Sequence, residues 1–381
     1  MRVLVTGGAG FIGSHVCDLL IEEGHEPVVL DNLDEQVHGK MRRGEWPKYL
    51  RSDIERFRGD VRNRSDLDSL VKDADCIIHL AACVGVGQSA YDIAKYTDVN
   101  VTGTAVLLES IDAVNPSLKK LIVAGSMSSY GEGLYIEPRI SKTVEVNVRP
   151  DSQMMERDWS VYWNEKECEP RPTPETKSFD CQSMYAMTKR DQEEMALLFG
   201  SQRGINVFVP RFFNVYGPRQ ALGNPYTGVA AIFSSRISAG KAPLIYEDGN
   251  QSRDFIHVRD VADVVVKMVD AHVGNGVFNV GTGTSTSIRQ LADLLLDHYG
   301  CADLGVEIKG KYRKGDIRHC FADTAKIDDF YLSHFGIDRK CISLQEGILD
   351  LVSWVTSVPD EAESVDHDAA HRELLENGML V

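Results

Sequence analysis

The N-terminal stretch Met1-Arg-Val-Leu-Val-Thr-Gly-Gly-Ala-Gly-Phe-Ile-Gly-Ser14 decides the fold of this chain. Its apolar run at residues 3–5 is too short for a helix and is followed by glycines, so it predicts a buried strand that enters a tight turn. Residues 14–21 then carry apolar side chains at helical spacing. At such a turn the helix N-terminus presents free N–H groups, and glycines allow a pyrophosphate to approach the backbone. The stretch therefore predicts a dinucleotide-binding site.

The acidic residue after the second predicted strand indicates which cofactor is bound. Residues 27–30, Pro-Val-Val-Leu, end in Asp31, close to the spacing of about 20 residues expected for a ribose-binding carboxylate. Such a carboxylate can accept hydrogen bonds from both ribose hydroxyl groups but would repel a 2′-phosphate. The next arginine is Arg42, so the sequence favours NAD over NADP. An ordinary strand-to-helix turn could explain the glycines alone, but not the whole order of strand, turn, helix, strand and Asp31.

Composition and charge exclude several classes of protein. The chain has 381 residues, of which 43% are hydrophobic, and a net charge of −16 without a long basic run. This length suffices for two lobes, and the charge makes nucleic acid and anionic membranes poor partners. No apolar run approaches the length of about eighteen residues that a membrane-spanning helix needs, and we expect no signal peptide because the first strand begins at the N-terminus. Eight cysteines without a C-x-x-C pair indicate reduced thiols, no metal site and a cytoplasmic location.

Short apolar runs that alternate with helical segments predict an α/β fold. We expect a Rossmann-type doubly wound parallel sheet, with further strands at residues 56–61, 76–82, 121–124, 207–209 and 278–280. Helices are predicted at residues 92–115, 183–199, 229–237, 288–299 and 344–355. The predicted NAD-binding Rossmann domain covers residues 1–212, with an insertion at 134–182 and a return segment at about 253–282. A smaller C-terminal α/β substrate-binding lobe follows at 213–355, and then an acidic tail at 356–381.

Two polar segments interrupt this pattern. Residues 32–53 are rich in Arg, Lys and Glu, which is typical of a loop or a short exposed helix. Residues 134–182 contain five prolines and no histidine, and they predict a long loop or small excursion of the kind that often carries function. Because this segment lacks histidine, Cys168 and Cys181 are interpreted as free thiols rather than metal ligands.

The sequence Tyr-Ala-Met-Thr-Lys at residues 185–189 places Tyr185 and Lys189 on one face of a predicted helix. Alone, such a pair usually means two exposed residues, but here it follows a strand that ends in Ser126. The Lys189 cation and a nicotinamide ring would favour the Tyr185 phenolate, which could remove a hydroxyl proton while hydride leaves the same carbon. Ser126 would hydrogen-bond to that oxygen. These three residues are therefore the predicted catalytic group.

Three other features suit a cofactor site. Asp60 ends the third predicted strand and could meet the adenine amino group, although capping of the helix that starts near Ser65 would explain it almost as well. Ala81 and Ala82 are small enough for the backbone to pass close to a cofactor. The glycine-rich loop at residues 84–89 follows a strand end, where ligands bind in open parallel sheets.

Five motifs can be compared with known families: Thr6-Gly-Gly-Ala-Gly-Phe-Ile-Gly13, His79-Leu-Ala-Ala82, Ser126 four residues before Tyr130-Gly131, Tyr185-x-x-x-Lys189, and Arg253-Asp-Phe-Ile-His-Val258. Together they resemble the extended short-chain dehydrogenase/reductase family of nucleotide-sugar enzymes. The resemblance runs from residue 1 to about residue 355, with the 134–182 insertion as the main departure. It implies an insertion near the substrate mouth and a homodimer that pairs through the helices at 92–115 and 183–199.

By this resemblance, Asn214, Arg253 and Arg313 fall where the family holds the diphosphate of a nucleotide-sugar substrate. Two arginines suit a phosphate-bearing ligand on an acidic protein. The predicted substrate-binding residues are Val84, Gln88, Ser128, Asn214, Arg253, Arg313 and Asp316. The predicted cofactor-binding residues are Gly7, Gly10, Phe11, Ile12, Gly13, Asp31, Asn32, Asp60, Val61, Leu80, Ala81, Ala82, Asn100, Tyr185 and Lys189.

The residues after Ser126 distinguish the reactions of this family. Dehydratases of the family carry Asp-Glu directly after this position, decarboxylases carry a Glu two residues after it, and GDP-mannose 3,5-epimerases carry a Cys there. This chain has Met127 and Ser128, neither of which moves a proton at neutral pH. The resemblance therefore leaves a 4-epimerase, which oxidises one carbon with NAD, lets the 4-keto sugar rotate and returns the hydride.

The expected sugar also comes from resemblance. Gly85-Val-Gly-Gln-Ser89 and Tyr312-Arg-Lys-Gly-Asp-Ile-Arg-His-Cys-Phe-Ala-Asp323 are similar to the dTDP-L-rhamnose 4-epimerases of this family. This similarity implies interconversion of dTDP-L-rhamnose and dTDP-6-deoxy-L-talose. The alternatives are a UDP-hexose 4-epimerase, a reductase of nucleotide 4-keto sugars and a non-catalytic NAD-binding scaffold.

Overall fold

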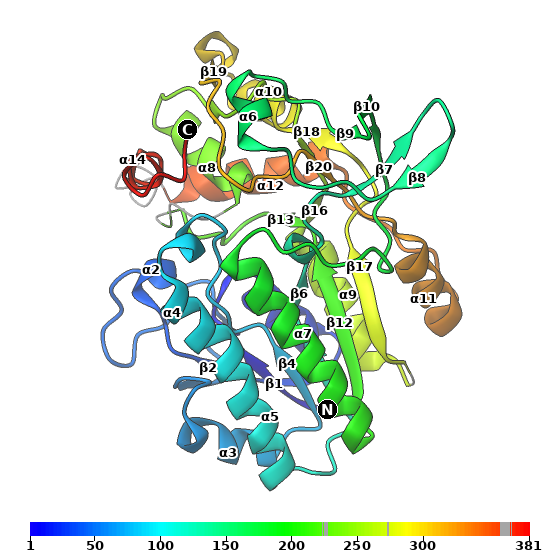
Figure 1. The fold of residues 1–381 in the computed structure, drawn as a ribbon. Coiled ribbons are helices and arrows are strands. Elements are labelled where there is room, and N and C mark those ends of the chain that lie inside the picture. The colour runs from blue at the N-terminus through cyan, green and yellow to red at the C-terminus, as the bar shows by residue number, and fades with distance from the viewer. Residues whose placement is uncertain (223, 225–227, 273, 359–365, 367) are drawn as a thin grey trace.

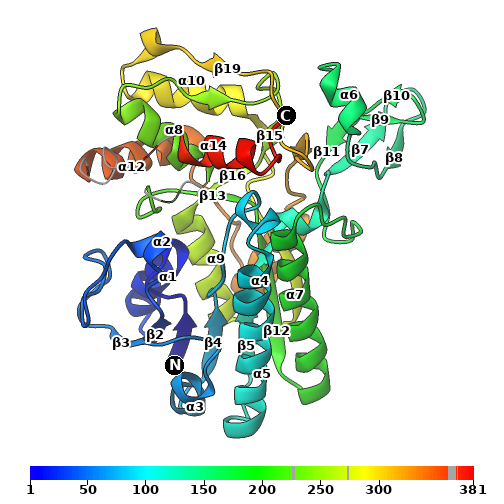
Figure 2. The same ribbon diagram turned by 60° about the vertical axis from the view of Figure 1, so that its left-hand side comes forward.

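The computed structural model of the chain describes residues 1–222, 224, 228–272, 274–358, 366 and 368–381. At its centre is a parallel sheet in the order β17-β12-β5-β4-β1-β2-β3, with helices on both faces (Figures 1 and 2). The strands are β1 (Arg2–Thr6), β2 (Glu26–Asp31), β3 (Glu55–Arg58), β4 (Cys76–His79), β5 (Lys120–Val123), β12 (Asn206–Phe212) and β17 (Gly276–Val280), with the short β6 (Gly125–Ser126) beside β12. The predicted Rossmann-type doubly wound α/β fold is confirmed.

The strand order reverses at β1, and this reversal fixes the place of the glycine turn. From β1 the chain builds outward to β2 and β3, and then crosses to the other side of β1 to add β4 and β5. Connections that leave β1 and β4 therefore diverge at the carboxyl edge of the sheet, which opens a crevice between them. The turn that begins at Gly7 lies at this crevice.

The two faces of the sheet are covered by separate apolar layers, because successive side chains of a strand point to opposite faces. Val3 and Val5 belong to the layer with α1 (Phe11–Glu22) and α9 (Val258–Asp270). Leu4 packs in the other layer, with helices α3 (Arg64–Lys72), α5 (Gly103–Val114) and α7 (Met184–Arg203).

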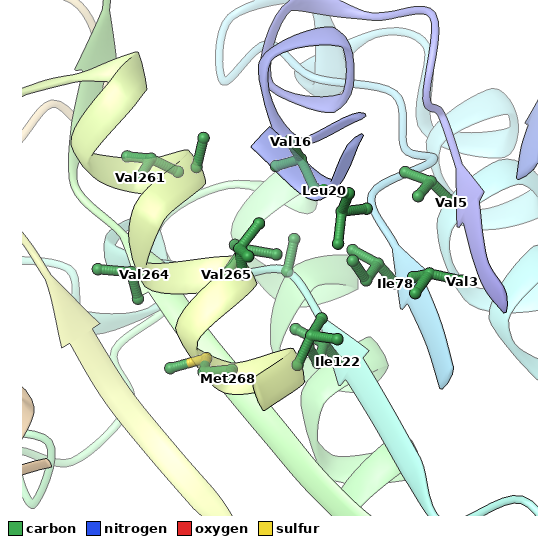
Figure 3. Packing of buried hydrophobic residues seen from close by; sticks show 14 of the residues in the cluster. Val3, Val5, Val16, Leu20, Ile78, Ile122, Val261, Val264, Val265 and Met268 are labelled. Carbon is green, nitrogen blue, oxygen red and sulfur yellow. The ribbon is translucent and has the colours of Figure 1, made fainter. Parts of the chain in front are cut away.

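The spacing of apolar residues in α9 explains why this segment forms a helix that packs on the sheet. Four of its apolar residues recur at the spacing of one helical face and are buried in one apolar cluster with Val3, Val5, Ile78 and Ile122 of the sheet (Figure 3): Val261, Val264, Val265 and Met268. The end of α9 also contacts β5, because the Lys120 ammonium group donates a hydrogen bond of 2.7 Å to the carbonyl oxygen of Ala271.

Helix α9 was not predicted, whereas the predicted helices are present with small changes in their bounds. Helix α7 continues past residue 199 to Arg203 and ends at Gly204, which has the left-handed conformation (φ +69°) common at helix ends. The remaining ones are α8 (Val229–Ser238), α10 (Ile288–His298) and α12 (Leu344–Ser357). Among the described residues, no helix has the length and apolar character needed to cross a bilayer.

The helix predicted over residues 92–115 has an irregular middle. α4 (Ile93–Tyr96) is followed by a π-helical turn at Thr97–Thr102 and then by α5. Asn100 lies in this turn and is fully buried. A π turn widens the helix by one residue per turn and is frequent at functional sites.

Several local predictions need correction. The third and fourth strands are shorter than predicted, since β3 ends at Arg58 and β4 at His79, and the residues after them turn away from the sheet to line a cavity. Helices α11 (Ala325–Phe335) and α14 (Ala369–Glu376) were not predicted, and α14 lies within the predicted acidic tail. Residues 359–365 and 367 of that tail lie outside the described residues.

The insertion is a small folded excursion rather than a loop. Antiparallel strands β11 (Glu169–Arg171), β7 (Leu134–Glu137) and β8 (Lys142–Val144) form a sheet beside the β9 (Tyr162–Trp163) and β10 (Lys166–Glu167) hairpin and helix α6 (Asp151–Met155). It has an apolar core of its own, made of Tyr135, Val144, Val146, Val161 and Cys168. The excursion lies beside the C-terminal lobe (Figure 1).

The C-terminal lobe is built around α8, α10 and α12, which share one apolar cluster. Its short strand pairs are β13 (Asn214–Tyr216) with β16 (Phe255–His257), β14 (Leu244–Ile245) with β19 (Glu307–Ile308), and β15 (Ser252–Arg253) with β18 (Thr286–Ser287) and β20 (His319–Cys320). After β16, α9 and β17 return the chain to the central sheet.

Candidate active site

A cavity of about 540 Å³ opens at the carboxyl edge of the sheet and is lined from both the Rossmann part and the C-terminal lobe. The predicted cofactor-binding residues that line it are Gly7, Gly10, Phe11, Ile12, Gly13, Asp31, Asn32, Asp60, Val61, Leu80, Ala81, Ala82, Tyr185 and Lys189. The predicted residues Val84, Gln88, Ser126 and Asn214 line the same cavity. The fold thus brings segments from residue 7 to residue 214 into one site.

The glycine turn is too tightly packed for side chains. A Cβ atom on Gly7, whose φ is +71°, would lie 2.8 Å from the backbone nitrogen of Ala81, and one on Gly13 would lie 2.3 Å from the carbonyl oxygen of Gly7. Helix α1 begins at Phe11, and its N-cap residue is Gly10. Because glycine has no side chain, it cannot cap the first N–H groups of the helix. Those N–H groups remain available to an anion such as a pyrophosphate.

Asp31 lies at the end of β2, where its carboxylate is only 8% exposed. It accepts hydrogen bonds from the backbone N–H groups of Ala9 at 3.0 Å and Leu33 at 2.9 Å. Burial raises the pKa of Asp31, and nearby His38 and the two N–H donors oppose that rise. Because each carboxylate oxygen has two lone pairs, both oxygens can still accept a hydroxyl group of a ribose.

Gln36 and His38, in the segment that follows Asp31, were not predicted as part of the site. Helix α2 (Glu35–His38) carries His38, whose side chain is 3% exposed with its Nε2 3.7 Å from the Asp31 carboxylate, and Gln36, which donates 2.9 Å to Gln88. Both line the cavity. The expected loop or exposed helix is thus partly a cavity wall. Asp34, which caps α2 through the N–H of Gln36, was the sequence signal for this helix.

Asp60 lies on the cavity wall but already has partners. Its carboxylate accepts hydrogen bonds from Arg62 at 2.7 Å and from Asn32 at 3.2 Å. The hydrogen bond from Arg62 is the main reason that the pKa of Asp60 falls to about 2. The alternative reading of Asp60 as a helix cap is wrong, because Asn63 occupies the N-cap position of α3.

Asn100 lies behind the cavity wall rather than on it. Its side chain accepts a hydrogen bond from the backbone N–H of Cys83 at 2.7 Å and donates to the carbonyl oxygen of Cys83 and the hydroxyl group of Thr188. It therefore braces the backbone after β4 against helix α7. A direct contact of Asn100 with a cofactor stays a prediction.

The three predicted catalytic residues come together. Ser126 ends β6, and Tyr185 and Lys189 occupy successive turns of α7, which Ser183 caps through the N–H of Ala186 at 3.1 Å. Burial raises the pKa of Tyr185, whereas its hydrogen bond with Ser126 lowers it. Burial also lowers the pKa of Lys189 to about 8. Its ammonium group donates to Gln192 at 2.8 Å, so the expected direct effect of Lys189 on Tyr185 remains a prediction.

The residues after Ser126 provide no acid or base at the cavity. The Ser128 hydroxyl group lies 2.8 Å from the Ser126 hydroxyl group, and its backbone N–H donates to the same oxygen at 3.2 Å. Met127 packs in a small apolar cluster with Tyr130 and Phe213. Ser128 therefore orients Ser126, and its predicted contact with substrate stays a prediction.

The predicted diphosphate residues are only partly assembled. Asn214 lines the cavity, and its amide oxygen is buried without a hydrogen-bond partner among the described residues. Arg253 instead donates to Asp316 at 3.1 Å and to the carbonyl oxygen of Ile317 at 2.8 Å. Arg313 lies over the ring of Tyr246 at 4.9 Å. The two arginines are not on the cavity wall that the described residues form.

The unpredicted C-terminal end explains the position of Arg313. The backbone of Tyr312 forms two hydrogen bonds with Val381, at 3.1 and 3.0 Å, and Arg313 pairs with Leu380. His371 of α14 contacts the hydroxyl group of Tyr246 at 2.9 Å. The end of the chain thus forms part of the lobe around Arg313.

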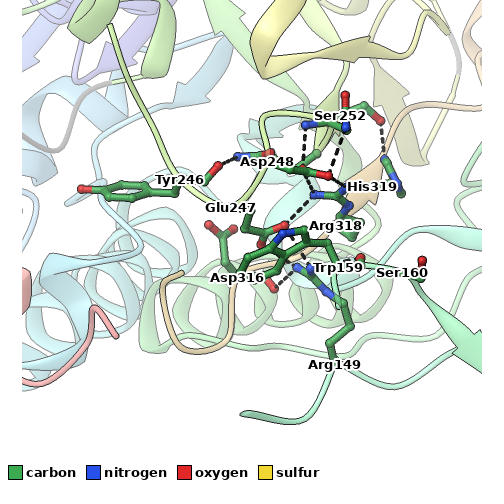
Figure 4. Close-up of polar contacts among 12 residues, drawn as sticks. Arg149, Trp159, Ser160, Tyr246, Glu247, Asp248, Ser252, Asp316, Arg318 and His319 are labelled. Carbon is green, nitrogen blue, oxygen red and sulfur yellow. Dashed lines mark hydrogen bonds and ion pairs between the residues drawn. The ribbon is translucent and has the colours of Figure 1, made fainter. Parts of the chain in front are cut away.

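The insertion is joined to the C-terminal lobe by buried charges (Figure 4). Arg149 donates to both carboxylate oxygens of Glu247 at 3.0 and 2.8 Å, and Arg318 donates to Glu247 at 2.7 Å. All three side chains are at most 7% exposed. Arg149 also donates to the carbonyl oxygen of Asp316 at 3.3 Å, so the insertion holds the segment of Asp316 and Arg318. Arg253 of β15 donates to the carbonyl oxygen of Arg318 on that segment.

The fold and this site define an NAD-dependent enzyme of the extended short-chain dehydrogenase/reductase class. The model of the NAD dependent epimerase/dehydratase family matches residues 3–154 and 160–281, and the chain belongs to that family.

The relatives agree with this assignment. The dTDP-L-rhamnose 4-epimerase of Burkholderia thailandensis is 32% identical, over 94% of this chain and 96% of its own length. A UDP-glucose 4-epimerase from Thermotoga maritima, solved with UDP-glucose, is 30% identical with a TM-score of 0.74 and covers 94% of this chain and 100% of its own. A UDP-glucose 4-epimerase from Thermus thermophilus, solved with NAD, is 27% identical with a TM-score of 0.72 and covers 93% and 99%. The predictions of an epimerase-class enzyme and of NAD as its cofactor are confirmed.

Proposed function

We propose that the protein is a nucleotide-sugar 4-epimerase that oxidises and then re-reduces C4 of its substrate. The observation that carries this proposal is the meeting of Ser126, Tyr185 and Lys189 in the cavity that also holds the glycine turn and Asp31. The absence of an acid or base at Met127 and Ser128 supports epimerisation over dehydration or decarboxylation.

Bound NAD supplies a hydride acceptor at the carbon that is oxidised. In the proposed reaction, Tyr185 removes the proton of the 4-hydroxyl group, and Ser126 hydrogen-bonds to the same oxygen as its carbonyl character develops. Because burial keeps Tyr185 neutral in the ligand-free chain, positive charge near the phenol is needed to make it a base at neutral pH. Lys189 provides that charge below its pKa of about 8. On the return step, Tyr185 gives its proton back to the oxygen.

We propose dTDP-L-rhamnose and dTDP-6-deoxy-L-talose as the substrate pair. The similarity to the Burkholderia thailandensis enzyme supports this choice, and the similarity to UDP-glucose 4-epimerases keeps UDP-hexoses as the second candidate. The purified protein is incubated with dTDP-L-rhamnose, UDP-glucose and UDP-galactose without added reductant. We expect the 4-epimer from the dTDP sugar with at least about tenfold higher kcat/KM. If the enzyme prefers a UDP-hexose, that sugar replaces dTDP-L-rhamnose as the proposed substrate. If it converts none of the three nucleotide sugars, the result would support a reductase or a non-catalytic scaffold.

We also propose that the enzyme is a cytoplasmic homodimer. Helices α5 and α7 pack against each other, and α7 exposes the apolar side chains of Met187 and Leu198, at 39% and 60%. A self-complementary helical face of this kind suits a two-fold dimer. Light scattering is expected to give twice the chain mass of 42.3 kDa. A concentration-independent mass of one chain would reject the dimer.

A further inference from the structure

The Lys189 ammonium group is held inside the protein by a residue that the proposed reaction does not use. The Lys189 side chain lies on α7 and is 4% exposed. It donates a hydrogen bond of 2.8 Å to the side-chain oxygen of Gln192, one turn further along the helix. Gln192 is itself 1% exposed, so this contact is shielded from water and stronger than an equivalent contact at the surface.

Gln192 is in turn fixed by a chain of buried polar groups that reaches the glycine turn. Its side-chain nitrogen donates to the hydroxyl group of Thr104 at 2.7 Å. His79, at the end of β4, contacts that hydroxyl group through Nε2 at 3.0 Å and the hydroxyl group of Thr6 through Nδ1 at 2.7 Å. Thr6 is the last residue of β1, directly before Gly7. This hydrogen-bond network therefore links α7, α5, β4 and β1.

The protons at the Lys189 end of this hydrogen-bond network have one arrangement. An ammonium group can only donate, so the amide oxygen of Gln192 must face Lys189 and the amide nitrogen must face Thr104. The Thr104 hydroxyl proton is committed to the carbonyl oxygen of Asn100 at 2.7 Å, so Thr104 accepts from Gln192. His79 Nε2 also lies 3.3 Å from the side-chain nitrogen of Gln192. His79 therefore either donates from Nε2 to Thr104 and accepts from Thr6 on Nδ1, or accepts from Gln192 on Nε2 and donates to Thr6 from Nδ1. Burial, together with the Lys189 charge, lowers the pKa of His79 to about 3, which keeps this ring neutral.

We propose that Gln192 is a positioning residue that holds the Lys189 ammonium group in a fixed place relative to the cofactor turn and to Tyr185, which lies one helical turn away on α7. The proposal rests on the proposed role of Tyr185 and Lys189. Its physical basis is that the Gln192 amide cannot rotate without placing an N–H group against the ammonium group and leaving Thr104 without a donor. Two of the three Lys189 N–H groups stay available to ligands.

Few charged groups face Lys189. Glu193, on the same helix, raises its pKa, but both Glu193 oxygens already accept from Arg211 on β12. His79 on β4 is neutral, and Tyr185 is a neutral phenol in the ligand-free chain. A new charge at position 192 would therefore change the field at Lys189 and Tyr185 strongly.

The test compares Gln192→Glu and Gln192→Met in the full-length enzyme loaded with NAD. The alkaline limb of the kcat profile should lie near pH 8, where Lys189 loses its proton. We expect the midpoint of this limb to move to higher pH by about half a unit or more in Gln192→Glu, because a carboxylate stabilises the ammonium form of Lys189. It should move to lower pH in Gln192→Met, because the hydrogen-bond acceptor is lost. Glu194→Gln, on an exposed residue of the same helix (58% exposed), should leave the profile unchanged.

A second readout does not depend on turnover. Ultraviolet titration of the Tyr185 phenolate in the NAD complex, with Tyr185→Phe as the reference, should show a higher midpoint in Gln192→Glu than in the wild type. The role of Gln192 would be overturned if both variants lost activity while the pH midpoint of the alkaline limb stayed the same. It would also be overturned if the midpoint of the phenolate titration in Gln192→Glu equalled that of the wild type. A wild-type protein that converts no nucleotide sugar would reject the proposed function instead, and the phenolate titration would still decide the role of Gln192.

Discussion

Tyr185→Phe is expected to lower kcat by about a thousandfold or more and to change the affinities for NAD and nucleotide sugar by less than about twofold. The substitution removes only the hydroxyl group that takes and returns the substrate proton. The ring still packs edge-on against Tyr96, with centroids 6.4 Å apart, so the site should keep its shape. Steady-state kinetics and calorimetric binding of NAD and substrate measure the two effects separately.

Tyr162→Phe is the matched control, because it removes the same hydroxyl group from a tyrosine that is 40% exposed in the insertion. Its activity should equal that of the wild type. Tyr185→Phe with more than about a tenth of the normal kcat, or with NAD affinity reduced as much as activity, would contradict the assignment of Tyr185 as the proton-transfer residue.

Arg211→Met is expected to lower the free energy of unfolding by about 3–5 kcal/mol, because it leaves the buried Glu193 carboxylate without its cation. Arg211 lies on β12 and is 4% exposed. It donates to Glu193 on α7 at 2.9 Å and to the hydroxyl group of Tyr130 at 2.7 Å, so it joins the sheet to the helix that carries Tyr185. Chemical denaturation measures the loss.

Arg203→Met tests the same chemistry at the surface. Arg203, the last residue of α7, is paired with Asp112 of α5 at 2.6 Å, but these two side chains are 43% and 45% exposed. Its loss should cost less than about 1 kcal/mol, because exposed ion pairs are weak. Equal losses in the two variants would show that burial of the Arg211 pair does not contribute.

The parts of the fold that the sequence predicts are those decided by local periodicity. The glycine turn, the apolar runs of the central strands and the helical spacing of apolar residues in α10 each follow from residues close in sequence. Strand ends were less predictable, since residues 80–82 continue the apolar run of β4 but leave the sheet at His79. Helix α14 could not be predicted from an acidic segment, because its contacts are with distant residues such as Tyr246.

The same division applies to the site. Ser126, Tyr185, Lys189 and Asp31 stand in recognisable local contexts, and the structure places all four on one cavity. His38 and Gln192 have no such context, and their positions follow from how α2 and α7 pack on the sheet. Asn100, Arg253 and Arg313 were placed by resemblance, and each of them makes contacts within the protein that their residue types do not reveal.

The central claim is that hydride leaves C4 and returns to the same carbon, and the most direct test is the fate of a label. dTDP-L-rhamnose with deuterium at C4 is incubated with the enzyme in ordinary water without added NADH, and both epimers are analysed by mass spectrometry and NMR. The account predicts that the 4-epimer forms and keeps its deuterium at C4, because the hydride is stored within the enzyme and returned. Release of the deuterium to solvent, or a requirement for stoichiometric NADH, would contradict it.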